Sequence, residues 1–249
     1  MWSLNSRCDE FYVASRLFFK LALDPSRETL LHFLEQIRRA YPAMSRFHRA
    51  EDGSVVLEEE PQGDRHGDRY VKIEPGALKF GYYHAGSLET VERFADHVLA
   101  QAPYDLSLSD LDYDYMEVAY CFDLEYRGNH DELIADTLFA DHPLMHALGE
   151  HRHVVDCQPF FGIGLSEDCS TQAYLEVKSR TTTHEMRQGE YIPQPLSVYF
   201  TVRRYWGFGG SSDLATVHRE LLTAGEAIVQ HRVLPTVVQP LVEAIATRR

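Results

Sequence analysis

The chain has 249 residues and a formal net charge of −14, from 38 acidic and 24 basic residues. This excess of negative charge repels phosphate groups, so it disfavours nucleic acids and anionic membranes as partners. Hydrophobic residues make up 44% of the chain, which is enough for a folded core. The four cysteines form no CxxC pair, and the sequence contains neither a recognisable signal peptide nor a bilayer-spanning stretch. We therefore expect a cytoplasmic protein with free thiols and no membrane contact.

The first elements of the chain are a strand and a helix. Residues Phe11–Leu23 alternate between apolar and polar side chains, which predicts a long, half-buried strand. Asp24 and Pro25 follow as the predicted helix cap and first helical residue. Apolar residues then recur at helical spacing, so the helix is expected to end near Tyr41.

Turn residues divide the next stretch into short elements. Glu51-Asp52-Gly53 predicts a hairpin turn, and Pro75-Gly76 is expected to join strands at Arg69–Glu74 and Ala77–His84. Ser87 is the predicted cap of a second helix, since apolar residues follow it at helical spacing.

Residues Leu111–Tyr126 carry the clearest pattern in the chain. From Met116 onward the even positions are apolar, whereas before Met116 the apolar residues occupy the odd positions. Because a strand alternates its faces with period two, this reversal predicts a bulge, a bend or a strand start near Tyr115–Met116.

The remaining elements are predicted from the same signals. A strand is expected at Met116–Tyr126, and a helix at Asp131–Leu148 that Pro143 breaks. Further strands and a closing helix are expected, with two later prolines dividing the end of the chain: His153–Leu165, Thr171–Thr183, Leu196–Tyr205, a cap at Ser211-Ser212-Asp213, and breaks at Pro235 and Pro240.

The order strand, helix, strands, helix occurs twice along the chain. It predicts an α+β fold with two topologically similar halves, residues 1–110 and 111–249, packed as one unit. We expect mostly antiparallel sheets with helices on one face.

Two segments carry a family resemblance. The segment ALKFGYYHAGSLETVERF and the closing LATVHRELL resemble a sporadically distributed bacterial family of about the same length, whose function is not characterised. The likeness spans most of the chain in order, and it implies no activity.

A histidine-rich run is the main candidate for chemistry. On a helix, His142 and His146 would point the same way and suit one divalent transition metal, with His151, His153 or Asp156 completing the ligand set. The run contains no HExxH motif. The alternative is a surface helix that carries histidines without a metal.

Two groups of charged residues are also candidate binding residues. Asp112 and Asp114 would share a strand face and bind a hard cation or divide acid and base roles, or they are solvated charges at the junction of the halves. Lys178 and Arg180 lead the main basic cluster, which Arg203 and Arg204 are expected to join, and they would bind a carboxylate or phosphate or pair with neighbouring acids.

An aromatic pair follows the last predicted strand. Trp206 and Phe208 would form an exposed aromatic contact patch beside a glycine turn, or the glycines only connect the strand to the closing helix.

No set of residues forms a complete catalytic motif. The sequence therefore favours a binding or assembly protein without catalytic activity or cofactor, which acts through a protein partner or self-association. The alternative is a metal-dependent enzyme that uses the histidine run. A nucleic-acid enzyme built from duplicated ferredoxin-like units fits the element order, but the charge of −14 disfavours it.

Overall fold

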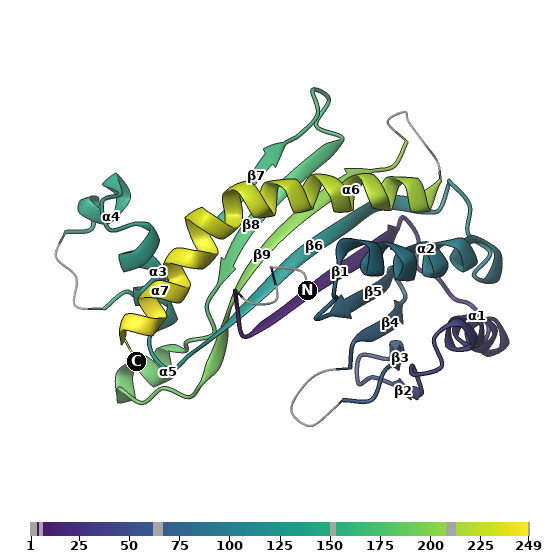
Figure 1. Ribbon diagram of the computed structural model, residues 1–249, viewed down its shortest axis with the longest axis horizontal. Coiled ribbons are helices and arrows are strands. Elements are labelled where there is room, and N and C mark those ends of the chain that lie inside the picture. Colours follow the sequence, from purple (N-terminus) through teal and green to yellow (C-terminus); the bar gives the residue numbers. More distant parts are fainter. Residues whose placement is uncertain (1–3, 5–6, 62–66, 150–152, 208–212, 249) are drawn as a thin grey trace.

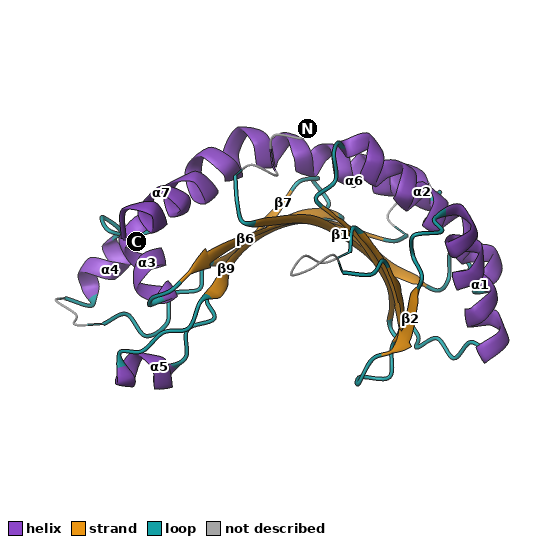
Figure 2. Cartoon of the chain, turned by 60° about the horizontal axis from the view of Figure 1, so that its bottom comes forward, coloured by secondary structure: helices purple, strands orange, loops and turns teal. Residues whose placement is uncertain are grey.

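The computed structural model describes residues 4, 7–61, 67–149, 153–207 and 213–248. Within these residues the chain forms an antiparallel sheet of nine strands with helices along one face, which confirms the predicted α+β class. The sheet is strongly curved, and the long helices lie on its convex side (Figure 2). No helix among the described residues crosses the opposite, concave side.

The strands follow the order β2-β3-β4-β5-β1-β6-β9-β8-β7. Their bounds are β1 Glu10–Phe19, β2 Arg46–Arg49, β3 Val55–Glu58, β4 Arg69–Glu74, β5 Ala77–Tyr83, β6 Tyr113–Tyr126, β7 Phe160–Gly164, β8 Thr171–Lys178 and β9 Gln194–Tyr205. At the centre, β1 and β6 pair antiparallel with Ala14 facing Ala119. Strands β1–β5 come from residues 1–110 and β6–β9 from residues 111–249, so this central pair joins the two parts into one sheet.

Both parts of the sheet follow a similar path. The first strand of each part pairs with the last strand of the same part, β1 with β5 and β6 with β9. A helix follows each of these four strands. An origin by duplication stays a prediction.

Most of the helices lie on the apolar face of the sheet (Figure 1), but α5 (Thr183–Gln188) lies beyond the end of the sheet, toward its concave side (Figure 2). The bounds of the other helices are α1 Arg27–Ala40, α2 Leu88–Asp105, α3 His130–Leu138, α4 Pro143–Ala147, α6 Leu214–Ile228, the π-helix η2 Val229–Val238 and α7 Gln239–Arg248. The last three form a continuous helical run over β6 and β9. At this contact the fully buried Tyr120 of β6 donates its hydroxyl hydrogen to the carbonyl oxygen of Leu222 in α6. The even positions of β6 therefore face the core.

The reversal near Tyr115–Met116 is a β-bulge. Phe18 of β1 faces Tyr115, but Phe19 faces Tyr113, so Asp114 is an extra residue in β6. The bulge lets Tyr113 and Met116 both point into the core, where they are 3% and 1% exposed. The prediction of a bulge is confirmed, and β6 extends through it.

Several local predictions are confirmed. The hairpin at residues 51–53 joins β2 to β3, and Pro75-Gly76 joins β4 to β5. Ser87 caps α2 by accepting the amide hydrogen of Thr90, and Asp213 caps α6 in the same way. Each cap supplies an acceptor for an amide that the first helical turn leaves unpaired.

The start of α1 was predicted wrongly. The cap is Ser26, whose hydroxyl accepts the amide of Thr29 at 3.1 Å, and the helix begins at Arg27. Strand β1 ends at Phe19, so Leu21 and Leu23 lie outside it, and Leu21 is 77% exposed. The sequence pattern continues beyond the strand because Leu21 and Leu23, in the following loop, keep the two-residue spacing of apolar side chains.

The predicted breaks at Pro235 and Pro240 were also wrong, because η2 runs directly into α7 and Pro240 lies inside α7. The helix continues through Pro235 as the π-helix η2, and the amide of Gln239 donates to the carbonyl oxygen of Leu234, five residues back. The hydroxyl of Thr236 donates to the carbonyl oxygen of Arg232 at 2.7 Å. The wider π turn accommodates the proline ring, and the threonine hydroxyl satisfies a nearby carbonyl.

Residues 131–165 form less regular structure than predicted. The helix breaks before Pro143, as expected, which separates α3 from α4. The expected strand at His153–Leu165 was too long, because only Phe160–Gly164 pairs with β8.

Candidate functional site

The concave face of the sheet is its most distinctive surface. It carries the side chains at even positions of β1 and at odd positions of β6 and β9, because the opposite positions face the helices. Tyrosine is the recurrent residue of this surface: Tyr12, Tyr70, Tyr83, Tyr115, Tyr174, Tyr199 and Tyr205. The helices that cover the convex face leave this tyrosine-rich face open (Figure 2).

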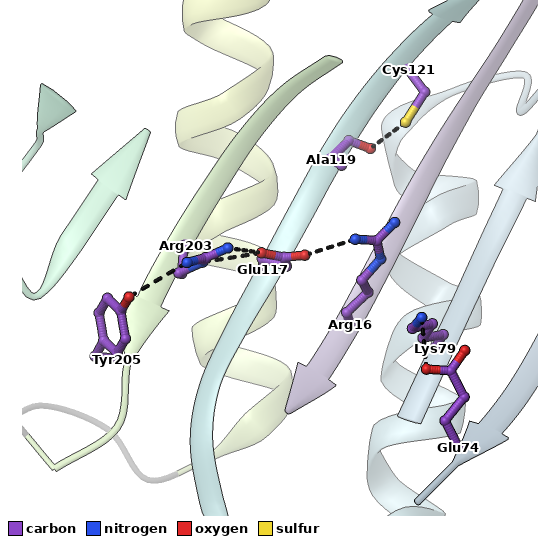
Figure 3. A network of polar contacts seen from close by, with 8 residues as sticks. All are labelled: Arg16, Glu74, Lys79, Glu117, Ala119, Cys121, Arg203 and Tyr205. Carbon is purple, nitrogen blue, oxygen red and sulfur yellow. Dashed lines mark hydrogen bonds and ion pairs between the residues drawn. The ribbon is translucent and has the colours of Figure 1, made fainter. Parts of the chain in front are cut away.

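A charged triad lies at the centre of the concave face (Figure 3). Glu117 on β6 stands between Arg16 on β1 and Arg203 on β9, because the three residues are in register on adjacent strands. Its Oε1 accepts from Nη1 of Arg16 at 3.1 Å, and its Oε2 accepts from Nε and Nη2 of Arg203 at 3.0 and 2.8 Å. The Glu117 side chain is 4% exposed, so two cations balance one desolvated carboxylate.

The two arginines of the triad differ in their surroundings. The guanidinium of Arg203 lies between two rings, 4.3 Å from the centroid of Tyr115 and 5.0 Å from that of Tyr174. Burial alone would lower the pKa of Arg203, but hydrogen bonds to Tyr205 and Glu117 raise it above its usual value. Arg203 is thus held in place.

Arg16 is the accessible arginine of the triad. Its Nη1 bonds Glu117, and 43% of its side chain is exposed. The triad has one positive charge in excess, so the exposed side of Arg16 can receive an anionic group such as a carboxylate.

Small residues form the floor beside the triad. Ala14, Ala119 and Cys121 are nearly buried, and the rings of Tyr12 and Tyr199 pack against them. Because these side chains are small, the tyrosine rings can pack directly against the sheet.

Gly81 extends this floor onto β5. A Cβ atom at Gly81 would lie 2.4 Å from Cε1 of Tyr70, so the glycine makes room for that ring. The tyrosine layer therefore depends on small residues beneath it.

The concave face is suited to binding rather than to acid–base chemistry. Burial raises the pKa values of Tyr12, Tyr70 and Tyr83, so these phenols stay neutral and act as hydrogen-bonding groups. Burial also raises the pKa of the Cys121 thiol, which is 3% exposed and therefore a poor nucleophile. The triad carboxylate is already occupied by two guanidinium groups.

The predicted basic cluster is divided between the two faces. Arg203 joins the triad, whereas Arg204 lies on the helix side and pairs with Glu220 of α6. Arg180 donates to the hydroxyls of Ser197 and Tyr199 at 3.4 and 3.3 Å. Lys178 faces Ser197 at the end of β8. Arg180 and Lys178 thus border the concave face beyond the tyrosine layer.

The predicted histidine ligands lie on the short helix α4 and in the segment that follows it. His142 is the cap of α4, and its Nδ1 accepts the amide hydrogen of Leu144 at 3.2 Å. His146 lies in the last turn of α4, and His153 lies 3.9 Å from a carboxylate oxygen of Glu132. The carboxylate of Asp156 accepts a hydrogen bond from the side-chain Nε2 of Gln158 at 3.1 Å.

His151 lies outside the described residues. Among the residues that are described, no three His, Cys, Asp or Glu side chains gather as a metal site. The metal site stays a prediction.

The two aspartates of the junction have structural roles. The carboxylate of Asp112 accepts from the amide and hydroxyl of Ser109, both at 2.8 Å, and so closes the turn before β6. Asp114 is the bulged residue, and its carbonyl oxygen accepts the amide hydrogen of Trp206. The two carboxylates therefore lie at a turn and at a bulge, in different local settings.

The predicted aromatic patch rests on one described residue. Trp206 packs edge-on against Tyr113, with the ring centroids 5.0 Å apart, and it lies partly buried against the core. Phe208 lies outside the described residues.

The triad was not predicted from the sequence. Arg16, Glu117 and Arg203 lie far apart in the sequence, and each has the pattern of a solvated charge on the polar side of its own strand. One signal was present, because the nearest same-face neighbours of each residue are uncharged: Tyr115 and Ala119 beside Glu117 on β6, and Thr201 and Tyr205 beside Arg203 on β9. A lone charge among such residues needs a partner across the sheet.

The chain has no match among models of known protein families or among curated protein sequences. None of the helices in the described ranges combines the length and apolar character needed to cross a bilayer. The concave face is thus the basis for a functional argument.

Proposed function

We propose that this chain is a cytoplasmic binding protein without catalytic activity, and that it holds a protein partner on the concave face of its sheet. The observation that carries the proposal is the open face itself, a layer of half-buried tyrosines around the triad Arg16–Glu117–Arg203. Tyrosine and arginine are enriched where proteins bind proteins, because they bury large areas and still form hydrogen bonds.

The physical properties of the face support this function. Its aromatic rings are fixed by neighbours, as in the pair Phe18–Tyr115, whose centroids are 4.3 Å apart, so binding orders few side chains. Arg16 offers an exposed cation for a carboxylate of the partner, beside the neutral floor of Ala14 and Ala119. The free state of all four cysteines fits a reducing cytoplasm.

Site-specific photo-crosslinking in the source cells tests the proposal. A benzophenone amino acid replaces Tyr205 on the concave face in one variant and Leu31 in α1, on the convex side, in another. We expect a covalent adduct with a discrete protein from position 205 and none from position 31. Equal adducts from both positions, or none from position 205, would contradict the proposal.

A matched pair of arginine variants sharpens the test. Arg16→Ala should reduce the adduct from position 205, whereas Arg38→Ala, which removes an exposed arginine of α1, should not.

The same face can be offered a labelled single-stranded oligonucleotide at low salt, since bases stack on aromatic rings. We expect no change in anisotropy, and saturable binding that Arg16→Ala abolishes would replace the protein partner with a nucleic acid.

A further inference from the structure

Strand β7 is one edge of the sheet, and it is uncharged and exposed. Its sequence is FFGIG, and Phe160, Phe161 and Ile163 are 61%, 57% and 56% exposed. The opposite edge, β2, has the sequence RFHR, and charges of this kind protect an edge from unwanted pairing. β7 lacks this protection, and no described element lies beyond it in the sheet (Figure 1).

The backbone of β7 shows which groups face the open edge. The amide of Leu165 donates to the carbonyl oxygen of Thr171, and the carbonyl oxygen of Pro159 accepts from the amide of Val177. The backbone groups of the odd-numbered residues therefore form the hydrogen bonds with β8. Amide and carbonyl groups alternate sides along an antiparallel strand. The amide and carbonyl groups of the even residues Phe160, Gly162 and Gly164 therefore point outward, where they suit the backbone of another strand.

We propose that β7 pairs antiparallel with β7 of a second copy of this chain, about a two-fold axis at Gly162. In this register Gly162 faces Gly162 of the second copy, and the outward groups of the even residues bond one another. Phe160 lies opposite Gly164, where no side chain opposes the ring. Phe161 lies opposite Ile163, an aromatic and β-branched pair of the kind that stabilises sheets. The sequence FFGIG thus complements itself.

The chain already uses the pairing of an aromatic ring with glycine inside its own sheet. Tyr70 faces Gly81 and Tyr174 faces Gly162, with the rings in the space that a Cβ atom would occupy. Pairing between Phe160 and Gly164 of two copies repeats this arrangement at the edge. An uncharged strand also lets two copies approach without opposing like charges along the strand itself.

The expected dimer is weak. A large aromatic side chain offers roughly 200 Å², so these three half-exposed side chains supply on the order of 300 Å² per copy. A standard interface buries about 800 Å² per partner. Each copy has a net charge of −14, which opposes association at low salt. The dimer should therefore depend on concentration and should strengthen as salt screens this repulsion.

Sedimentation equilibrium of the full chain up to about 0.5 mM tests the pairing. We expect the average mass to rise toward twice that of the monomer, and Ile163→Lys to keep it at the monomer value. Phe47→Lys on the opposite edge is the matched control, because Phe47 is 50% exposed on β2, and it should associate like the wild type. Far-UV circular dichroism checks the fold of both variants. A wild type that stays monomeric, or an Ile163→Lys variant that still associates, would overturn the proposal.

Disulfide trapping tests the register. With Cys169 replaced by serine, copies carrying Phe161→Cys are mixed with copies carrying Ile163→Cys and oxidised. These positions form a non-hydrogen-bonded pair, whose Cα atoms lie about 4.5 Å apart, within disulfide range. We expect the mixed dimer to exceed either self-linked dimer at least about tenfold, because the self-linked pairs are about 7 Å or more apart. Equal yields would contradict the register. Neither test involves the concave face, so its proposed function can fail separately.

Discussion

Replacing Glu117 by alanine should destabilise the fold far more than the loss of an ordinary surface acid. The substitution removes three charge-assisted hydrogen bonds and leaves two guanidinium groups without their shared carboxylate. Removing one partner of a buried ion pair costs about 3–5 kcal/mol. The side chains of Arg16 and Arg203 are 43% and 24% exposed, so water compensates for part of the loss. We expect the free energy of unfolding to fall by about 2–3 kcal/mol and the Tm by about 4–12 °C.

Urea unfolding followed by circular dichroism measures this change. Glu117→Gln keeps the size and one acceptor oxygen, so it should cost about half as much. Glu35→Ala is the matched control, because Glu35 also pairs with two arginines, Arg38 and Arg39, but on the exposed surface of α1. Its loss should change stability little. If Glu117→Ala and Glu35→Ala had equal effects, burial of the triad would not be the source of its stability.

Three further outcomes follow from buried groups. Burial lowers the pKa of His218 from 6.5 to about 3, so unfolding takes up a proton between these values and stability falls as the pH drops below 6.5. His218→Gln should flatten this decline in acid unfolding curves by up to about 1.4 kcal/mol per pH unit, whereas the exposed His231→Gln should leave it unchanged. Gly225→Ala should lower the free energy of unfolding by about 1–3 kcal/mol despite its better helix propensity, because its Cβ would lie 2.5 Å from the Tyr120 ring; unchanged stability would show that α6 can shift. A thiol reagent should label the exposed Cys169 of the native protein fastest, the partly exposed Cys8 and Cys157 more slowly, and the buried Cys121 only after unfolding.

Local signals predicted the architecture well, because helix caps, hairpin turns and alternation act over a few residues. Ser87 and Asp213 cap helices through their own next turn, and the reversal near Met116 is the bulge at Asp114. The errors arose where a longer context decides. Pro235 is compatible with a helix only because η2 widens around it, and single-residue rules contain no such adjustment.

The candidate site could not be predicted because sheet register brings it together. Arg16, Glu117 and Arg203 become neighbours only when β1, β6 and β9 pair in one particular alignment. A shift by one residue would turn each side chain to the opposite face. The sequence shows which side chains alternate, but it does not show which strands are adjacent. The histidine run is the opposite case: His142 and His146 are close in sequence and share the short helix α4, but among the described residues they do not gather with a third metal-ligating side chain.

The proposed β7 pairing would determine how two concave faces are oriented. Even positions of β7 belong to the concave side, since Gly162 faces Tyr174, and the register pairs even positions with even positions. The two-fold axis then runs perpendicular to the sheet, so both triads open in the same direction. A partner that is itself dimeric would contact both faces, and its second contact would form at a high effective concentration. Ile163→Lys should therefore weaken the binding of a dimeric partner and leave that of a monomeric partner unchanged, which titration calorimetry can distinguish.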